Sequence, residues 1–337
     1  FAEACVLETV LLSIYNFDSA IAAAASRMTA MAEDRPCAEM GSRRTHEWAA
    51  VGAARAAYIA GFSATSNLEA GRAYGIPTMG TAAHSFTLLH DSEEDAFRAQ
   101  LDALGVETTL LVDTYDVEAA IRKGVELTEG RLGAIRLDSG DLPMMARQAR
   151  DLLDDLGATS TRITVTSDLD EWQIAALRGA PVDGFGVGTS LVTGSGHPTC
   201  GFVYKLVARS ESADREAPMT PVGKKSKGKN TLGGRKFAMR RLGENGRAEA
   251  EIIGLGAAPV GDGNDRHLLV DIVKDGQLVF PGTLEDARTR HRESLAELPL
   301  AALRISRGDP AIETIILDGA GVQTTNPYQA APRPANL

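Results

Sequence analysis

Between about residue 60 and residue 207, short apolar runs alternate with longer segments of helical period. This alternation predicts parallel strands, because each intervening helix returns the chain to the same end of the sheet. The predicted strands are GFSATS, IPTMGT, TTLLVD, LGAIRLD, RITVTS, VDGFGVG and FVYKLVA. Because strands so apolar are buried on both faces, we expect an α/β fold with a TIM-like barrel, incomplete or irregular; an open doubly wound sheet is the alternative.

Segments of helical period lie between the predicted strands. Most of them end with glycine, as the C-terminus of a helix often does. They are NLEAGRAYG, DSEEDAFRAQLDALG, DVEAAIRKGVELTEG, DLPMMARQARDLLDDLG and DEWQIAALRGA. A longer helical pattern covers the first 33 residues. We therefore expect the first domain, residues 1–207, to be an α/β barrel core that opens with a long helix.

The pattern changes after residue 207. A stretch rich in charge, Gly and Pro predicts a long exposed loop, which includes the basic segment KKSKGKNTLGGRK at 224–236. KFAMRRL, AEAEIIGL and RHLLVDIVKDGQLVF then predict antiparallel strands with turns at 244–246 and 275–276, and a helix follows near 283–297. Residues 208–337 are thus expected to form a smaller α/β domain rich in antiparallel strands.

Charge and cysteine usage limit the partners. A net charge of -10 disfavours nucleic acid and anionic membranes, although a local basic cluster can still hold a small anion. No apolar run reaches the ~20 residues that cross a bilayer, and nothing resembles a signal peptide. Cys5, Cys37 and Cys200 are far apart, which disfavours a disulfide framework and a zinc site. We expect a cytoplasmic protein that acts on small molecules.

Polar side chains follow the predicted strands, at the end where barrel enzymes keep their active sites. In IRLDSGDL, alternation along a strand puts Arg136 and Asp138 on one side, and SGD opens a helix whose free amides suit an anion. Arginine can hold a phosphate or carboxylate, and aspartate can take sugar hydroxyls or Mg²⁺. A buried Arg–Asp pair, with Asp141 as a helix cap, explains the pattern equally well.

Two other segments suit phosphorylated sugars. In VTSDLDEW, Asp168 follows Ser167 at a strand end and could bind ribose hydroxyls, whereas Asp170 is interpreted as the first residue of a helix. The glycine-rich FGVGTSLVTGSG lets backbone amides approach a phosphate, although a plain turn has the same composition.

Two basic or titratable features remain open from the residues alone. Arg43 and Arg44 in MGSRRTHEW suit a diphosphate, but adjacent arginines are more often solvated. His84 in GTAAHSF is the histidine at the end of a predicted strand, and the local sequence has no carboxylate to orient it. A nucleophile, an acid–base group and a structural residue stay as alternatives for His84.

Taken in order, these motifs resemble those of the nicotinate phosphoribosyltransferase family, particularly its bacterial members. The matching segments are GTAAHSF, IRLDSGDL, TSDLDE, FGVGTSLVT, VYKLV and KKSKGK, preceded by ETVLLSIYNFDSAIAAAASRM and EMGSRRTHEWAAV. The resemblance covers nearly the whole chain. The family has further sequence upstream, so we expect that the chain, which starts at Phe1 inside a helical pattern, lacks an N-terminal segment.

The resemblance implies an ATP-coupled enzyme of NAD salvage that forms nicotinate mononucleotide and pyrophosphate from nicotinate and phosphoribosyl pyrophosphate. It also implies ATP and Mg²⁺ as cofactors, a homodimer with shared active sites, and phosphorylation of His84 by ATP. Asp138 and Asp168 would be catalytic with His84. The implied substrate-binding residues are Arg43, Thr65, Ser66, Asn67, Arg136, Ser139, Gly140, Ser167, Gly188 and Thr189. The family often has Phe where this chain has Met40.

Four alternatives accompany this prediction. A nicotinamide phosphoribosyltransferase is the nearest, although a neutral Ser66 at the pyridine wall is compatible with an acid. Quinolinate transfer has no need of the His84 motif. An aldolase-type barrel would form a Schiff base through a strand lysine, for which Lys205 is the candidate. A non-catalytic metabolite-binding module would bind ligand without turnover.

Overall fold

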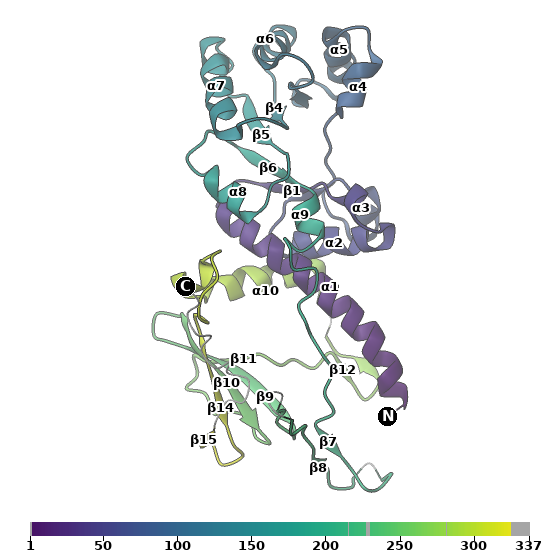
Figure 1. The fold of residues 1–337 in the computed structure, drawn as a ribbon, viewed down its shortest axis with the longest axis vertical. Coiled ribbons are helices and arrows are strands. Elements are labelled where there is room, and N and C mark those ends of the chain that lie inside the picture. Colours follow the sequence, from purple (N-terminus) through teal and green to yellow (C-terminus); the bar gives the residue numbers. More distant parts are fainter. Residues whose placement is uncertain (1, 215, 227–229, 281, 325–337) are drawn as a thin grey trace. The chain divides into compact units, whose positions relative to one another are not determined.

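The structure of the 337-residue chain is a computed structural model. The structure describes residues 2–214, 216–226, 230–280 and 282–324. The chain forms two compact units, each described separately below (Figure 1). The first contains Phe1–Phe202 and Leu284–His291, and the second contains Val203–Thr283 and Arg292–Leu337. The expected domain division after residue 207 stays a prediction.

A parallel sheet of six strands forms the centre of the first unit, in the order β2-β1-β6-β5-β4-β3. Its strands are β1 (Cys37–Glu39), β2 (Ala64–Thr65), β3 (Thr109–Leu111), β4 (Ala134–Leu137), β5 (Arg162–Val165) and β6 (Gly184–Val187). Every neighbouring pair is parallel. Strand residues such as Ile135, Ile163 and Phe185 are at most 1% exposed, as expected for a parallel sheet covered on both faces. The α/β class with a parallel sheet is confirmed.

Two predicted strands are wrong, and one strand was missed. The sequence did not predict β1, which lies in the interior of the sheet. IPTMGT contributes only an isolated parallel bridge between Thr65 and Thr78, because Pro77 has no backbone N–H to donate to a ladder. FVYKLVA contributes only Ala208 to a strand, and its apolar side chains Phe202 and Val203 are 50% and 66% exposed. Because these side chains are not buried, a strand here would not be stabilised by their packing, which is the origin of β-propensity.

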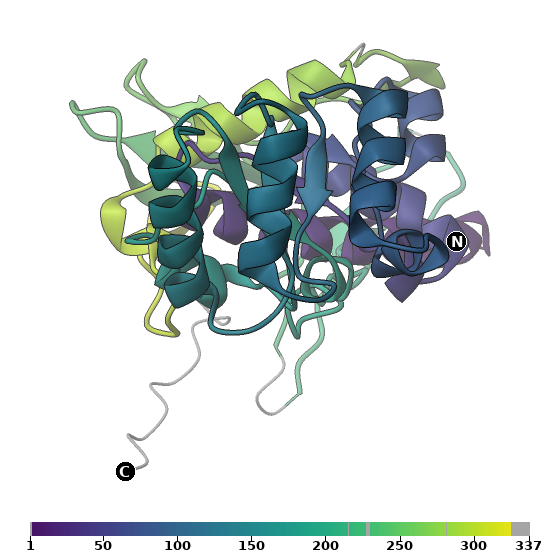
Figure 2. The ribbon, with the colours of Figure 1, turned by 90° about the horizontal axis from the view of Figure 1, so that it is seen from above.

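Helices alternate with these strands as predicted. They are α1 (Ala2–Ala32), α2 (Glu47–Ile59), α3 (Leu68–Tyr74), α4 (His84–Leu89), α5 (Glu93–Leu104), α6 (Val117–Leu127), α7 (Leu142–Asp155), α8 (Glu171–Ala176) and α9 (Thr189–Val192), with a 3₁₀ turn, η1 (Ser42–Arg44). Helices α5, α6 and α7 lie side by side in both views (Figures 1 and 2).

Side-chain caps fix where several of these helices begin. The Asp116, Asp141 and Asp170 carboxylates accept hydrogen bonds from backbone amides at the starts of α6, α7 and α8. Asp141 is therefore a helix cap, as one of the two interpretations of IRLDSGDL has it, and Asp170 caps the start of α8, where the sequence predicted the beginning of a helix. Ser92 and Asn67 cap α5 and α3 in the same way.

Helix α1 has two different halves. From Ala20 to Ala32 its side chains Ile21 and Met28 are fully buried, and this half packs on α2 and α8. The first half exposes apolar side chains. By length and composition α1 could cross a membrane, so the statement that no apolar run is long enough is wrong for this helix. Length and composition alone are weak evidence of a span, because the core helix of a soluble protein passes the same test.

The second unit is built on a five-stranded sheet in the order β11-β9-β10-β14-β15. Its strands are β9 (Lys236–Leu242), β10 (Ala248–Leu255), β11 (Arg266–His267), β14 (Glu313–Leu317) and β15 (Gln323–Thr324). All pairs are antiparallel except β10 with β14. Met239, Ala250 and Ile252 form its buried core.

Shorter elements complete this unit. They are β7 (Ala208–Arg209), β8 (Thr220–Pro221), β12 (Val273–Lys274), β13 (Gln277–Leu278), η2 (Leu300–Leu303) and the second part of α10 (Leu284–Ala296). Asp275 and Gly276 both have positive φ and form the predicted turn between β12 and β13. Of the predicted basic loop at 224–236, residues 227–229 lie outside the described residues.

Several side chains hold the first part of α10 against the rest of the first unit, among them Glu285, Arg288 and His291. Arg288 donates hydrogen bonds to the backbone carbonyls of Tyr58, Gly61 and Phe62, which lie at the end of α2. The unpaired carbonyls at a helix C-terminus favour a cation there. These contacts explain why Leu284–His291 belongs to the first unit although the sequence placed it in the second.

Candidate active site

A cavity of about 500 Å³ opens at the C-terminal ends of the sheet strands in the first unit. Residues from the loops after β1, β2, β4, β5 and β6 form its walls, as the position of active sites in barrel enzymes predicts. The predicted site residues that line it are Arg43, Ser66, His84, Arg136, Asp138, Ser167, Asp168, Gly188 and Thr189. The other lining residues are Met40, Ser42, Arg44, Gly80, Thr81, Ala83, Thr166 and Gly186.

Four predicted site residues do not line this cavity. Thr65 is fully buried behind its wall, so the predicted contact of its side chain with substrate has no support in this geometry. The side chain of Asn67 caps α3, and that of Ser139 donates to Asp113. Gly140 lines a neighbouring cavity of about 370 Å³, which shares Ser167 and Asp168 with the first.

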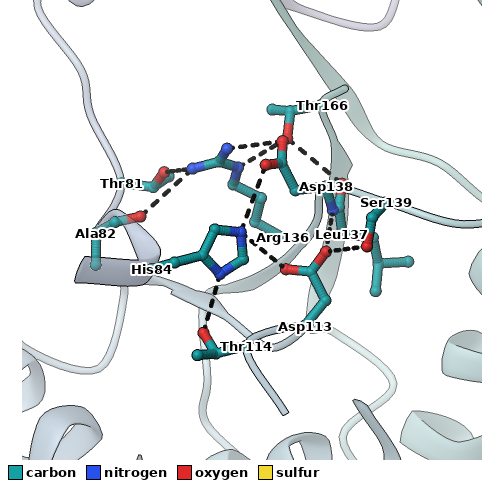
Figure 3. Close-up of polar contacts among 10 residues, drawn as sticks. All are labelled: Thr81, Ala82, His84, Asp113, Thr114, Arg136, Leu137, Asp138, Ser139 and Thr166. Atoms are coloured by element: carbon teal, nitrogen blue, oxygen red, sulfur yellow. Dashed lines mark hydrogen bonds and ion pairs between the residues drawn. The ribbon is translucent and has the colours of Figure 1, made fainter. Parts of the chain in front are cut away.

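Arg136 organises one wall of the cavity (Figure 3). Its Nη2 donates to Asp138 Oδ1 at 2.8 Å, its Nε to Thr166 Oγ1 at 2.8 Å, and its Nη1 to Thr81 Oγ1 at 2.7 Å. Thr166 in turn donates to the Asp138 carboxylate. The Arg136 side chain is only 12% exposed, so most of its hydrogen-bonding groups are already directed by these three partners.

The Arg136–Asp138 pair supports both interpretations of IRLDSGDL at once. It is a partly buried ion pair, and both residues also line the cavity. Burial alone would raise the pKa of Asp138, but hydrogen bonds from Thr166 and Arg136, together with the charges of Arg136 and His84, hold that pKa below its usual value. Asp138 is therefore an anion at neutral pH, directed at the cavity.

His84 is the first residue of α4, and its ring lies between a hydroxyl and two carboxylates (Figure 3). Nδ1 lies 3.1 Å from Thr114 Oγ1. Nε2 lies 3.6 Å from Asp138 Oδ2 and 3.9 Å from Asp113 Oδ1. The carboxylates that the local sequence lacks are thus supplied by the ends of β3 and β4. With its side chain 42% exposed, His84 remains accessible from the cavity.

Asp113 is a buried carboxylate that contacts the residues after β4. Its side chain is 3% exposed, and its Oδ2 accepts hydrogen bonds from the Asp138 amide and from Ser139 Oγ, both at 2.9 Å. Its Oδ1 has no hydrogen-bond partner among the described residues and faces His84. A buried acceptor without a donor is costly, which sets this oxygen apart from the satisfied groups around it.

The glycine-rich turn after β6 and the strand end of β5 complete the walls. Gly188 and Thr189 begin α9 on one side of the cavity. Ser167 has φ of 103°, a conformation that residues with a side chain rarely adopt. Such backbone strain is concentrated at functional sites, which agrees with the position of Ser167 in the wall.

The sequence missed several hydroxyl groups of this site, including Thr166, Thr81, Thr114 and Ser42. Thr166 is the residue directly before Ser167 at the predicted strand end, so its position alone could have indicated it. Thr81 lies in the wrongly predicted strand IPTMGT, and only the fold brings it to Arg136. Met40, which the resemblance marked as a departure from the family, lines the cavity.

Comparison with characterised proteins decides the family. Over 323 residues the chain is 53% identical to nicotinate phosphoribosyltransferase pncB1 of Mycobacterium tuberculosis, a match that covers 93% of this chain and 70% of that protein. The chain belongs to the nicotinate phosphoribosyltransferase family. The nicotinate phosphoribosyltransferase of Bacillus subtilis is 40% identical over 271 residues, or 77% of this chain and 54% of that protein. No protein-family model matches the chain.

Solved structures agree with this assignment. The crystal structure of human nicotinic acid phosphoribosyltransferase superposes with a TM-score of 0.72 at 25% identity, over 92% of this chain and 74% of that one. That of nicotinate-nucleotide pyrophosphorylase from Pyrococcus furiosus gives 0.71 at 24% identity, over 86% and 73%, and shows a common fold. The resemblance to nicotinate phosphoribosyltransferases, a family of enzymes, is confirmed.

The structure does not support Lys205 as a Schiff-base lysine. Lys205 lies outside any strand, in an exposed segment, and its ammonium donates to the neighbouring Tyr204 carbonyl. An imine-forming lysine needs a desolvated position, whereas Lys205 is exposed. The prediction that Lys205 is a strand lysine is wrong.

Proposed function

We propose that this chain catalyses the transfer of a phosphoribosyl group from phosphoribosyl pyrophosphate to nicotinate, coupled to ATP hydrolysis. The products are nicotinate mononucleotide and pyrophosphate, and the reaction is the first step of NAD salvage from nicotinate. The observation that carries the proposal is the 53% identity to a nicotinate phosphoribosyltransferase over 93% of the chain. The charges around the cavity support it, because both substrates are anions.

The cavity offers separate groups for each part of the substrates. Arg43 and Arg136 would bind phosphates or the nicotinate carboxylate, and Ser66 would donate to that carboxylate. Gly188 and Thr189 would bind the 5′-phosphate through backbone amides and a hydroxyl. These roles fall to residues of three loops and of strand β4.

The carboxylates would act on the ribose. Departure of pyrophosphate leaves positive charge at C1 and the ring oxygen, as in other reactions with an oxocarbenium-like transition state. Asp138, held as an anion by Thr166 and Arg136, would stabilise that charge, while Asp168 would bind the ribose hydroxyls. The nicotinate ring nitrogen then forms the new bond to C1.

We propose that His84 is the residue phosphorylated by ATP. ATP supplies a phosphoryl group, which bonds to an imidazole nitrogen as its bond to ADP breaks. Thr114 holds the ring through Nδ1, and Nε2 faces the Asp138 and Asp113 carboxylates at 3.6 and 3.9 Å. Phosphorylation adds negative charge beside Asp138, so it would change the electrostatics of the substrate site directly.

Mg²⁺ is proposed as the companion of the phosphate groups. Among the residues that the structure describes, no group of three His, Cys, Asp or Glu side chains could hold a metal ion. Mg²⁺ commonly binds through one or two carboxylates and the substrate phosphates, and Asp138 and Asp168 are the carboxylates that line the cavity. Bound there, the ion would draw charge from the departing pyrophosphate.

Three broader proposals accompany the activity. The six-stranded parallel sheet, with helices between its strands, is proposed to be an incomplete TIM-like barrel. The enzyme is proposed to be a cytoplasmic homodimer with shared active sites. Its acidic net charge of -10 supports the absence of nucleic-acid and membrane partners.

The test combines labelling with turnover. Protein incubated with γ-labelled ATP should acquire acid-labile label, and mononucleotide formation should be faster from nicotinate than from nicotinamide. His84→Ala should lose the label and reduce turnover by at least about 100-fold. His90→Ala is the matched control, because His90 lies in the same segment, bonds to the Phe86 carbonyl and does not line the cavity.

Unlabelled wild type that still makes nicotinate mononucleotide would contradict the phosphohistidine. Equal label in the His84→Ala variant would place the modification elsewhere. Faster turnover of nicotinamide would favour the alternative substrate.

A further inference from the structure

A buried carboxylate lies outside the cavity and has no role in the chemistry above. Glu39 is the last residue of β1 and is 1% exposed. Both of its carboxylate oxygens are used: Oε1 accepts from the Gly41 amide, and Oε2 accepts from Thr65 Oγ1. A buried carboxylate is costly unless its acceptors are satisfied, so these two donors are required partners of the fold.

These hydrogen bonds belong to a closed ring that joins two loops. Thr65 Oγ1 also accepts from the Asn67 amide at 2.9 Å, and Asn67 Nδ2 donates to Ser42 Oγ at 3.0 Å. Ser42 follows Gly41, so the ring returns to the loop where it began. The Ser66 amide donates to the Glu39 carbonyl at 2.8 Å, which adds a backbone link between the same loops.

The two loops carry much of the cavity wall. The loop after β1 supplies Ser42, Arg43 and Arg44, and the loop after β2 supplies Ser66. A third loop rests on the first, because a Cβ added to Gly41 would lie 2.9 Å from the Gly188 carbonyl oxygen and would also collide with Val192. Displacement of Gly41 would therefore reach the glycine-rich turn as well.

We propose that Glu39 is a positioning residue that, through Gly41 and Thr65, fixes the anion-binding loops after β1 and β2 in register with each other. Thr65, assigned from the sequence as a substrate contact, then acts from behind the wall as the donor that ties β2 to this carboxylate. The inference rests on the proposed function only for its kinetic test. A role confined to stability would leave substrate affinity unchanged in the folded protein.

The test compares three variants. Thr65→Val removes the hydroxyl at nearly constant volume, and Thr65→Ser keeps it. Thr161→Val is the matched control, since Thr161 is also 1% exposed and donates to a carbonyl, but at the opposite end of the sheet, just before β5. Each variant is measured by thermal melting, by hydrogen–deuterium exchange over residues 40–44, and by steady-state kinetics.

We expect Thr65→Val and Thr161→Val to lower the melting temperature similarly. Only Thr65→Val should speed exchange over residues 40–44 and raise the KM for phosphoribosyl pyrophosphate, by about tenfold, because misplaced binding groups lose much of their interaction. Thr65→Ser should restore KM to within about twofold of wild type, because it keeps the donor to Glu39.

Two results would overturn the inference. One is unchanged exchange over residues 40–44 in Thr65→Val; the other is an active Thr65→Val enzyme with the wild-type KM. Wild type that forms no mononucleotide would instead refute the proposed function, and the exchange measurement would still decide whether Glu39 and Thr65 hold the loop.

Discussion

At the scale of single residues, His291 shows how the fold controls a proton. Its Nε2 lies 2.9 Å from Ser26 Oγ on α1. Burial, followed by the nearby charge of Arg288, lowers the pKa of His291 below its usual value. The folded chain therefore keeps this imidazole neutral under conditions in which an unfolded chain protonates it.

This pKa shift predicts a dependence of stability on pH. Well above pH ~6.5, the usual pKa of histidine, both states are neutral at this residue and the contribution is zero. Below that pH the unfolded chain binds the proton first, so the free energy of unfolding falls until the pH passes the lower folded pKa. His291→Gln should show a smaller loss between pH 7.5 and 5.5 in urea unfolding. A variant with the wild-type slope would contradict the assignment.

Single residues of the candidate site could be predicted only where a recognisable motif contains a side chain suited to the chemistry. Arg136, Asp138 and Asp168 were predicted because each stands at a strand end in a recognisable segment. Thr81 could not be predicted, since its role depends on a hydrogen bond to Arg136 across 55 positions. The role of Glu39 could not be predicted, because β1 has only three residues and is too short to show an alternation of apolar and polar side chains.

At the scale of elements, one ion pair joins three segments of the first unit. Arg27 on α1 donates to Glu171 at the start of α8 at 2.7 Å, and Ser195, in the turn after α9, donates to the same carboxylate at 2.5 Å. Glu171 is fully buried, whereas Arg27 is 32% exposed. The carboxylate therefore depends on its two donors for compensation.

Removal of one donor should destabilise the unit. We expect Arg27→Met to lower the free energy of unfolding by about 2 kcal/mol, a value below that of a fully buried pair because Arg27 is partly solvated. Arg72→Met is the control, because its pair with Glu69 is exposed and contributes little. Denaturant unfolding measures both, and equal effects would show that burial of Glu171 does not matter.

The elements themselves were mostly predictable. β4 and β5 follow from their apolar runs, and α6 and α7 from their period and caps. β1 was missed because its burial comes from β2 and β6, its neighbours in space, and not from any pattern in its three residues. IPTMGT was overpredicted for the opposite reason, since its apolar composition is interrupted by Pro77 and Gly80.

At the scale of the molecule, an acidic protein presents three arginines at its cavity. The net charge is -10, yet Arg43, Arg44 and Arg136 line the cavity. The surrounding acidic charge opposes the approach of an anion, while the arginines attract it at short range. Salt weakens this short-range attraction only at high concentration, because the Debye length is ~10 Å at 0.1 M and falls to ~3 Å at 1 M.

We therefore expect salt to weaken binding of the more highly charged substrate. Between 0.1 M and 1 M KCl, the KM for phosphoribosyl pyrophosphate should rise by about fivefold or more, and that for nicotinate by less, since it carries one charge. The melting temperature, recorded at each salt concentration, separates this effect from unfolding. A KM that falls with salt would mean that repulsion by the acidic surface dominates.

The place of β1 in the sheet also sets an order for folding. Cys37–Glu39 pairs on one side with β2, which is synthesised soon after, and on the other with Phe185–Val187 of β6. Pairing of strands so distant in sequence slows folding and leaves apolar surface exposed in the interval. Synthesis must therefore reach Val187 before β1 can pair with β6. The cavity is therefore completed late, and apolar surface of the nascent first unit stays open to aggregation until then.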